Sequence, residues 1–408
     1  MKHIVCYSLV FLVNYPVSGQ STGQHNSPIA PAHDEAPIVR FGVKWTVHSH
    51  ILNEDRPCWV YLPLSYVGSV DRTYPVLYLL DGDAHFGWAS EMVRFMSEIN
   101  GNFQIPESII VAIPNTRGNR TRDFTPTHSL KDSEGKDDPA QASSGGGQLF
   151  ETYIKRELIP KIEAEYRTAP YRIFVGHSLG GLLALDAVLR RPAVFQACIA
   201  IDPSIWWDNY ALLKTAKEVL PKATDLHQQV YVSLANNLPA EDFDPKPIAN
   251  ASRYYVEMLQ TNAPATFRSQ LDYFQSENHN SVPFLSLYHG LLFVFDGYKP
   301  PAYFENRASL QAHFKAISAR LRCEFLPPED FVNANGQYLW QVKHDAGEAV
   351  EFFKLSVKNY PNSADAYESL ARVYSTQGQS LLAIRNYKRA LELDPKRQSA
   401  VEALKRLK

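Results

Sequence analysis

A serine in the middle of the sequence stands in a setting that favours nucleophilic chemistry. Ser178 is part of the run GHSLGG, which follows the apolar stretch 171–175 and precedes the Ala- and Leu-rich stretch 182–190. A strand, a Gly-x-Ser-x-Gly turn and a helix in this order are typical of a nucleophile elbow, a sharp turn that exposes the serine hydroxyl. We predict that Ser178 attacks a carbonyl carbon, and that side chains at Gly176 and Gly180 would collide at this turn.

A serine nucleophile needs a base, and in this arrangement the histidine follows the serine along the chain. The candidates are His227, His279, His289 and His344. His279 comes just beyond the strand-like stretch 266–274, in a loop where the base belongs. His289 sits inside an apolar, helix-like run and is expected to pack in the core. His279 is therefore the predicted base.

The acid that would orient this histidine is less clearly marked. It usually follows the strand that we predict at 230–234, and we take Asp242, in the loop beyond that strand, as the acid. The alternatives are Glu277, Glu241, Asp244 and Asp202. Two other interpretations stay open: a dyad in which a backbone carbonyl steadies the histidine, and, for each carboxylate, a solvated loop charge.

Two backbone segments are placed to stabilise the negative charge that develops on a carbonyl oxygen under attack. The N–H of Leu179 begins the helix after the serine, where the positive end of the helix dipole adds to the effect. A second donor is expected from the loop after the strand 76–80. We assign Gly82 and Asp83 to this oxyanion hole, because glycine permits close approach of the backbone.

Two groups of side chains could contact a substrate. Trp206 and Trp207 lie shortly after the strand 197–201 and could wall an acyl or aromatic pocket; simple packing is the alternative. Arg117 and Arg122, with Arg120 between them, could hold an anionic substrate; otherwise they are solvated loop charges.

The elements that must position these residues alternate between strands and helices. Apolar stretches typical of strands covered on both faces occur at 75–80, 108–113, 171–175, 197–201 and 229–234. Helical spacing is found at 88–99, 148–166 and 182–190. The pattern predicts an α/β fold with a mostly parallel sheet, helices on both faces, and a ligand site at the carboxyl ends of the strands.

The C-terminal part repeats every 34 residues, which is the tetratricopeptide period. The pairs are Ala349 and Ala383, Phe353 and Tyr387, Pro361 and Pro395, and Ala366 and Ala400. The copy at 364–395 fits the pattern. The copy at 330–361 is degenerate in its first helix, where Gly336 stands at a position at which the repeat pattern has a different residue type. Residues 399–407 would form a capping helix. Because fewer than three repeats rarely stand alone, we expect this unit to pack on the preceding domain through 303–323. It serves either as a surface for a protein partner or as a stabilising cap.

The N-terminus has the pattern of a secretory signal. Lys2 precedes the apolar run 4–13, and small residues follow at 17–19. The run is shorter than the roughly 20 apolar residues of a membrane span. We expect residues 1–19 to be a cleaved signal peptide and 20–39 a disordered leader, which makes the protein periplasmic or secreted.

Composition narrows the classes of partner. The 408 residues include 41 basic and 43 acidic side chains, a net charge of -2 that gives no footprint for nucleic acid. Cys58, Cys198 and Cys323 would remain after cleavage, and this odd number without metal-ligand spacing excludes a disulfide framework. No later segment has the pattern of a membrane span. We expect a small-molecule substrate in a shaped pocket, with no metal, no cofactor and no stable membrane insertion.

Five motifs together resemble the putative-esterase family, which includes the enterobactin-esterase-like enzymes and, more distantly, esterase D and the mycolyltransferases. In order, they are LDG at 80–82, NTR at 115–117 with RDFTP at 122–126, GHSLGG at 176–181, DPSIWW at 202–207 and HNSVP at 279–283. The resemblance covers roughly residues 40–298. It implies an α/β-hydrolase fold, Ser178 as nucleophile, His279 as base, no cofactor, and a carboxylic ester or lactone as substrate, with siderophore trilactones as the best-known case.

The complete prediction is an exported serine esterase that works through an acyl-enzyme. Its hydrolase domain would span 40–298, a linker helix region 299–329, and the tetratricopeptide-like repeats with their capping helix 330–408. One alternative is an acyltransferase on the same fold, in which an alcohol replaces water. The other is a tetratricopeptide adaptor whose hydrolase domain is inactive.

Overall fold

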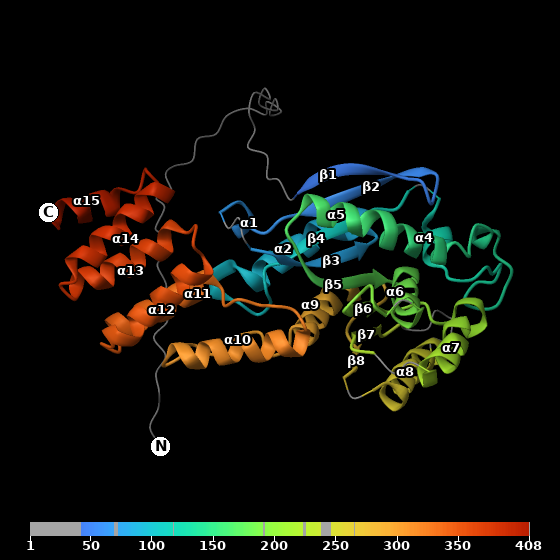
Figure 1. Ribbon diagram of the computed structural model, residues 1–408. Helices are drawn as coiled ribbons and strands as arrows, with labels where there is room; N and C mark the ends of the chain where they lie inside the picture. Colours follow the sequence, from blue (N-terminus) through green and yellow to red (C-terminus); the bar gives the residue numbers. More distant parts are fainter. Residues whose placement is uncertain are drawn as a thin grey trace, which may run out of the picture. The chain divides into compact units, whose positions relative to one another are not determined.

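The computed structural model describes residues 42–68, 72–116, 118–190, 192–222, 226–237, 246–264 and 266–407. The predicted signal peptide and leader, residues 1–19 and 20–39, lie outside this part of the chain. Within it, eight strands form one sheet in the order β1-β2-β4-β3-β5-β6-β7-β8 (Figure 1). The strands are β1 (Val43–Ser49), β2 (Glu54–Tyr61), β3 (Tyr74–Leu80), β4 (Ile109–Ile113), β5 (Thr168–His177), β6 (Ala197–Ile201), β7 (Gln229–Ala235) and β8 (Arg268–Phe274).

The sheet is mostly parallel, as predicted. β2 pairs antiparallel with β1 and β4, whereas β4, β3, β5, β6, β7 and β8 pair in parallel. Every residue of β3, β4, β6 and β7 is buried, which explains why these strands read as continuous apolar runs. Parallel pairing brings the carboxyl ends of six strands to one edge of the sheet, where a ligand site belongs.

Helices cover both faces of this sheet. One face carries α2 (Gly82–Ser97), α9 (Val282–Val294) and α10 (Arg307–Leu321); the other carries α4 (Gly147–Tyr153), α5 (Ile159–Glu165), α6 (Leu179–Arg190), α7 (Trp207–Val219) and α8 (Lys246–Asn262). Successive strand residues point to opposite faces. In β3, Leu77 and Leu79 therefore join the core under α2 and α9, whereas Tyr78 and Leu80 join the core under α6.

The helix predicted at 148–166 is present but contains a π-helical turn, Ile154–Leu158, between α4 and α5. Pro160 lies two residues after the end of this turn. Proline has no backbone N–H and cannot continue the α-helical hydrogen bonds, which is a physical reason for irregular winding here. Two short helices lie in loops: α1 (Ser65–Gly68) comes between β2 and β3, and α3 (Arg120–Phe124) follows β4.

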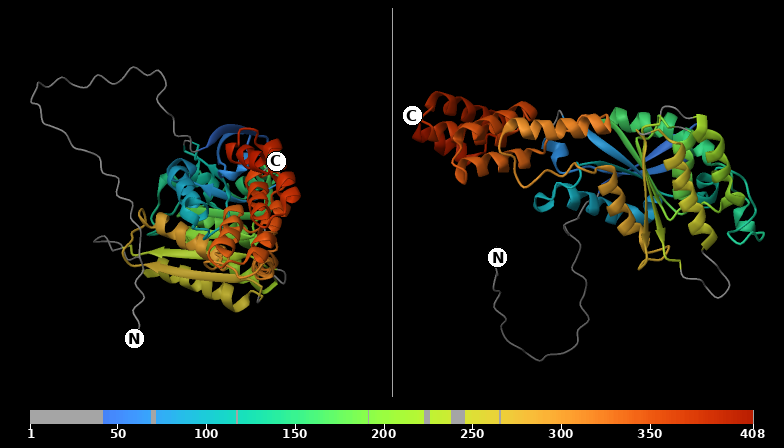
Figure 2. Two further views of the ribbon diagram at one scale, coloured as in Figure 1. Left: turned by 90° about the vertical axis from the view of Figure 1, so that its left-hand side faces the viewer. Right: turned by 90° about the horizontal axis from the view of Figure 1, so that it is seen from below.

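The C-terminal residues form a stack of helices, α11 (Glu329–Gln341), α12 (Ala346–Asn359), α13 (Ala364–Thr376), α14 (Ser380–Leu393) and α15 (Gln398–Arg406), in which neighbours in the sequence lie side by side (Figure 2). Ser363 accepts a hydrogen bond from the backbone of Ala366 and caps α13. The first repeat departs from the tetratricopeptide pattern for a structural reason. A Cβ at Gly336 would lie 2.8 Å from the ring of Phe353, so α11 and α12 pack too closely for a side chain there.

These helices share one apolar core with the sheet face that carries α2 and α9. The ring of Phe331 in α11 contacts Phe103 and Phe304, with centroids 5.8 and 6.0 Å apart. Asn335 donates to and accepts from the backbone of Phe304, at 2.9 and 2.6 Å. The repeats therefore pack on the preceding residues, as we expected.

Cys58, Cys198 and Cys323 are buried free thiols. Across the described helices, none has the length and hydropathy that a membrane crossing requires. The described residues likewise include no cluster of three or more His, Cys, Asp or Glu side chains that could hold a metal ion.

Candidate active site

Ser178 lies in the turn between β5 and α6, at the carboxyl edge of the sheet. Its φ of 60° is in the left-handed region, which is costly for a residue with a side chain and is typical of a nucleophile elbow. Its N–H donates to Ile201 O at 2.9 Å and its carbonyl accepts from Leu182 N at 3.0 Å, so the turn is held from β6 and from the helix. The strand, turn and helix predicted around Ser178 are confirmed.

The glycines of the elbow differ from our expectation. A Cβ at Gly176 would lie 2.2 Å from Gly180 O, so only glycine fits there. A Cβ at Gly180 would be 3.4 Å from its nearest neighbours, Asp81 and Leu80, which is an ordinary contact distance. The prediction of a collision at Gly180 is wrong, because its Cβ would point toward side-chain atoms at contact distance rather than into backbone.

His279 and Asp202 are in direct contact at this edge. His279 follows β8, Asp202 follows β6, and the distance from His279 Nδ1 to Asp202 Oδ2 is 2.6 Å. The Asp202 side chain is 4% exposed and that of His279 is 40% exposed. A buried carboxylate thus holds one ring nitrogen, which leaves Nε2 as the nitrogen available to a substrate or nucleophile.

The loop after β7 completes the surroundings of Asp202. Ala235 N donates to Oδ1 at 3.1 Å and Asn237 Nδ2 donates to Oδ2 at 3.0 Å. Burial alone would raise the pKa of Asp202, but the hydrogen bonds from His279 and Asn237 outweigh it and hold this pKa below its ordinary value. The carboxylate is therefore ionised at neutral pH and can stabilise a protonated His279.

The other candidate acids are placed less favourably or are not described. Asp242, our first choice, lies outside the described residues, as do Glu241 and Asp244. The side chain of Glu277 is partly exposed and accepts from Ser276 Oγ at 3.3 Å. Asp202, which the sequence offered only as an alternative, is the described carboxylate in contact with His279.

One of the other histidines considered as a base, His289, is placed differently from our expectation. His289 is exposed on α9, where its ring contacts Phe274 and Tyr288, so the expectation of a core histidine is wrong. The apolar run around His289 suggested that this side chain is buried. In α9, however, the buried positions nearby are Ser286, Leu287, Gly290 and Leu291.

Ser204 is a residue that the sequence reasoning missed. It is 5% exposed, its N–H donates to Ser178 O at 3.1 Å, and the two Oγ atoms are 3.2 Å apart. Its place in the DPSIWW motif, two residues after Asp202, was the available signal. Ser204 can orient the Ser178 hydroxyl before a substrate arrives.

The predicted oxyanion donors begin two helices at the same edge. Leu179 is the first residue of α6, and Gly82 and Asp83 are the first two of α2. A Cβ at Gly82 would be 2.9 Å from Ile113 N, so glycine is required for this close approach. The first N–H groups of a helix lack partners within it and favour negative charge.

Arg120 joins the loop after β3 to the elbow strand. Its Nε and one terminal nitrogen bind the two oxygens of Asp81 at 2.6 and 3.0 Å, and the latter nitrogen also reaches His177 O at 3.3 Å. Burial would raise the pKa of Asp81, but Arg120 holds it below its ordinary value. The charge of Arg120 is therefore paired within the protein.

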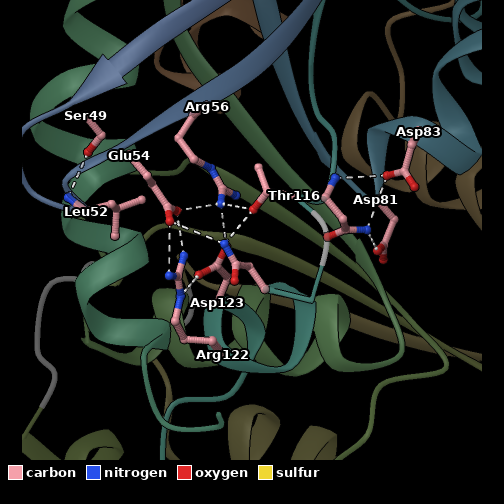
Figure 3. A network of polar contacts seen from close by, with 11 residues as sticks. Ser49, Leu52, Glu54, Arg56, Asp81, Asp83, Thr116, Arg122 and Asp123 are labelled. Carbon is pink, nitrogen blue, oxygen red and sulfur yellow. Dashed lines mark hydrogen bonds and ion pairs between the residues drawn. The ribbon is translucent and has the colours of Figure 1, made fainter.

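Arg122 belongs to a separate polar network (Figure 3). It binds Glu54 at 2.6 Å and Asp123 at 2.7 Å, and the buried Arg56 binds the same Asp123 at 2.9 Å. This network connects β2 to α3. It also pairs the charge of Arg122, which we expected to contact a substrate, with Glu54 and Asp123. Arg117 lies outside the described residues.

Trp206 and Trp207 differ in how far their side chains are exposed. Trp207 is 1% exposed and its Nε1 donates to Thr127 O at 3.0 Å, which fits the packing interpretation. Trp206 is partly exposed, with its ring 5.7 Å from that of Trp207. Of the two, Trp206 is the side chain that a substrate could contact.

Comparisons with known proteins show the family of this chain. A family profile described as putative esterase matches residues 49–281, and a tetratricopeptide-repeat profile matches residues 364–397. The chain is 30% identical to the ferri-bacillibactin esterase BesA of Bacillus subtilis over 237 residues, which cover 56% of this chain and 82% of that protein. It is 30% identical to a siderophore enterobactin esterase of Emericella nidulans over 177 residues, 40% of this chain and 57% of the relative.

A solved structure is similar over a larger share of the chain. It is an IroE-like serine hydrolase from Shewanella oneidensis, with a TM-score of 0.70 and 30% identity, and the match covers 77% of this chain and 98% of that one.

Proposed function

The chain belongs to the putative-esterase family, and we propose that it is a serine esterase with Ser178 as nucleophile, His279 as base and Asp202 as acid. The observation that carries the proposal is the 2.6 Å contact between His279 Nδ1 and the buried Asp202, at the sheet edge where Ser178 stands in its elbow. The assignment of Asp202 replaces our first choice, Asp242.

The proposed mechanism proceeds through an acyl-enzyme. Ser178 Oγ attacks the ester carbonyl carbon while His279 Nε2 takes its proton, and the N–H groups of Leu179 and of Gly82 or Asp83 stabilise the oxyanion. The C–O bond to the alcohol breaks, and His279 returns the proton to the leaving oxygen. A water molecule then gives a proton to His279 and attacks the acyl carbon. The bond between this carbon and Ser178 Oγ breaks, His279 returns the proton to Oγ, and the acid leaves.

We further propose that the substrate is an ester or lactone of the siderophore type. Support comes from the similar proteins, which include a ferri-bacillibactin esterase of Bacillus subtilis and a siderophore enterobactin esterase of Emericella nidulans. The reported relatives carry esterase or hydrolase names, so neither the acyltransferase nor the inactive adaptor is favoured.

Turnover of an ester panel tests the proposal. Short acyl, feruloyl and trilactone esters would be given to the wild type, to Ser178→Ala and to the control Ser204→Ala, which removes the neighbouring hydroxyl. We expect Ser178→Ala to lose at least about 10⁴-fold in kcat. Ser204→Ala should keep measurable turnover, and equal rates for the wild type and Ser178→Ala would contradict the assignment.

Export is a separate proposal, supported by the signal-like pattern at residues 1–19. N-terminal sequencing of the full chain after expression in a bacterial host tests it. A mature N-terminus near Gln20 outside the cytoplasm is expected, and an intact Met1 end on cytoplasmic protein would contradict it.

A further inference from the structure

A cavity of about 800 Å³ lies at the edge of the sheet opposite to Ser178. It is bordered by residues near which β5, β7 and β8 begin, among them Tyr171, Gln229 and Arg268, and by the C-terminal end of α10. Because β5 runs from this cavity to the elbow, at roughly 3.3 Å per residue, about 20 Å separate the two sites. The volume is within the range of small-molecule sites. We call this cavity the amino-edge pocket.

Three arginines line the amino-edge pocket: Arg268 at the start of β8, and Arg320 and Arg322 at the end of α10. Among the described residues that line the pocket, none carries a carboxylate. The carboxylate that pairs with these arginines from outside the lining is Asp296, whose side chain is 64% exposed and lies 3.1 Å from Arg268. The pocket therefore has an excess of positive charge.

The protein engages the three guanidinium groups to different degrees. Arg268 donates to Gln229 Oε1 and to Asp296 Oδ2, both at 3.1 Å, and is held in place by these bonds. Arg320 donates to the backbone oxygen of Asp296. For the side chain of Arg322, the described part of the chain provides no ion-pair partner, and both Arg320 and Arg322 are exposed. Two of the three charges can thus turn to a ligand.

The end of α10 does not take up these two charges. The last carbonyl groups of a helix often accept from arginine or lysine side chains nearby. Here Ala319 O accepts from the backbone N–H of Arg322 at 3.3 Å, and Ser318 O accepts from that of Cys323 at 3.2 Å. The turn is closed by the φ of 54° at Arg322, so its guanidinium group is not needed to end the helix.

The electrostatic environment of Arg320 agrees with an excess of positive charge. Partial desolvation, and next the charge of Arg268, lower the pKa of Arg320, although Asp296 acts in the opposite direction. An anion bound between Arg268 and Arg320 would relieve their repulsion.

The chemistry of guanidinium groups indicates the class of ligand. Their planar arrangement of N–H donors matches the two oxygens of a carboxylate or phosphate, which they bind through parallel hydrogen bonds. Three such groups around a pocket of this volume suit a molecule that carries more than one anionic group, since a single carboxylate or phosphate would fill a small part of it.

We propose that the amino-edge pocket binds a small organic polyanion, a molecule with at least two carboxylate or phosphate groups, through Arg268, Arg320 and Arg322. Arg268 would hold one anionic group from the sheet, and Arg320 and Arg322 would contact the ligand from the end of α10. This site is separate from Ser178, and its existence does not depend on the proposed esterase function.

Isothermal titration calorimetry on the full-length protein at constant ionic strength tests the proposal. Citrate probes for a polycarboxylate and fructose 1,6-bisphosphate for an organic phosphate, while acetate and inorganic phosphate are the counterparts with one anionic group. The variants are Arg320→Gln, Arg322→Gln and Arg322→Lys. Lys315→Gln is the matched control, because it removes one positive charge from an exposed position of α10 that does not line the pocket.

We expect citrate or fructose 1,6-bisphosphate to bind more tightly than its counterpart, and the one that binds identifies the anionic group. Arg320→Gln and Arg322→Gln should each raise Kd by about tenfold, because each removes charge-assisted hydrogen bonds. Arg322→Lys should lose less than Arg322→Gln, and Lys315→Gln should bind as the wild type does. Urea unfolding of each variant checks that these exposed substitutions leave the fold intact.

Three results would overturn the proposal. These are the absence of binding of both polyanions to the wild type, a Kd that neither glutamine variant at Arg320 or Arg322 changes, and an equal loss of affinity in Lys315→Gln. The last result would show a general attraction of anions to the surface rather than a site.

Discussion

Asp202 connects three loops that are far apart in the sequence. It follows β6, receives hydrogen bonds from Ala235 and Asn237 after β7, and holds His279 after β8. Its φ of 40° turns the backbone sharply at the end of the strand, which costs free energy and marks a position under functional constraint. At the residue scale, the proposed mechanism depends on this carboxylate.

We therefore expect Asp202→Asn to lower kcat by about 10²- to 10⁴-fold, because an amide cannot stabilise the protonated histidine and can favour the wrong tautomer. Asp242→Ala is the comparison, and it should change kcat by less than about tenfold, or 1.4 kcal/mol in the barrier. Steady-state kinetics on a short-chain ester measures both. A larger loss of kcat for Asp242→Ala than for Asp202→Asn would instead assign the catalytic acid to the loop after β7.

Local sequence was enough to select Ser178 and His279 as candidates, but it did not reveal that Asp202 is in contact with His279. The elbow is a contiguous pattern of strand, glycine, serine and helix, and His279 comes directly after a strand. The choice of acid depends on how the ends of β6, β7 and β8 meet at the sheet edge. The loop after β7 contributes Asn237 as a donor to the acid, a role that a search for carboxylates does not reveal.

The elbow is the element on which the site depends, and its two glycines allow a matched experiment. Gly176→Ala should lower the free energy of unfolding by about 3 kcal/mol or more, because its Cβ would lie 2.2 Å from a backbone oxygen. Gly180→Ala should change it by no more than about 1 kcal/mol, because the new methyl group has room and alanine favours a helix. Urea denaturation followed by circular dichroism distinguishes them, and equal losses would contradict this view of the turn.

Element types were predictable where the apolar pattern is strong. The buried strands β3, β4, β6 and β7 were each anticipated from apolar runs. The start of α2 was not: the helix begins at Gly82, whereas helical spacing was visible only from Trp88. The intervening residues GDAHFG contain two glycines and little apolar periodicity, and their helix is set by the end of β3 and the left-handed turn at Asp81.

At the scale of the whole molecule, carboxylates gather where the hydrolase domain meets α11. A cavity of about 480 Å³ there is lined by Glu98, Glu107, Glu329 and Asp330, with Arg72 bound to Glu107. Burial, and next the charge of Glu107, raise the pKa of Glu98 to about 7. The junction between the domain and its helical repeats therefore favours a protonated Glu98.

This shift predicts a pH-dependent stability. A folded-state pKa above the unfolded value means that the folded protein binds more protons between about pH 4.5 and pH 7, so stability falls as pH rises through this window. Glu98→Gln should make the pH-dependent decrease in the free energy of unfolding smaller by about 1 kcal/mol. This value is less than the full pKa shift would give, because the side chain is half-buried and solvent screens its charge. Urea unfolding of both proteins at pH 5 and pH 7.5 measures the difference, and parallel pH profiles would contradict the role of Glu98.

The small number of repeats was enough to predict that they pack on the domain. It did not predict which residues make the contacts. Asn335 of α11 binds the backbone of Phe304, which precedes the repeats, and Gly336 of the same helix admits the ring of Phe353 from α12. These contacts attach the repeats to the domain and stabilise their first helix pair.

The most direct test of the whole account is the identity of the residue that a fluorophosphonate probe modifies. The full-length wild type would be labelled, digested and mapped by tandem mass spectrometry beside Ser178→Ala. The account predicts one adduct, on Ser178, and no labelling of the variant. Equal labelling of both proteins, or an adduct on another residue, would contradict it.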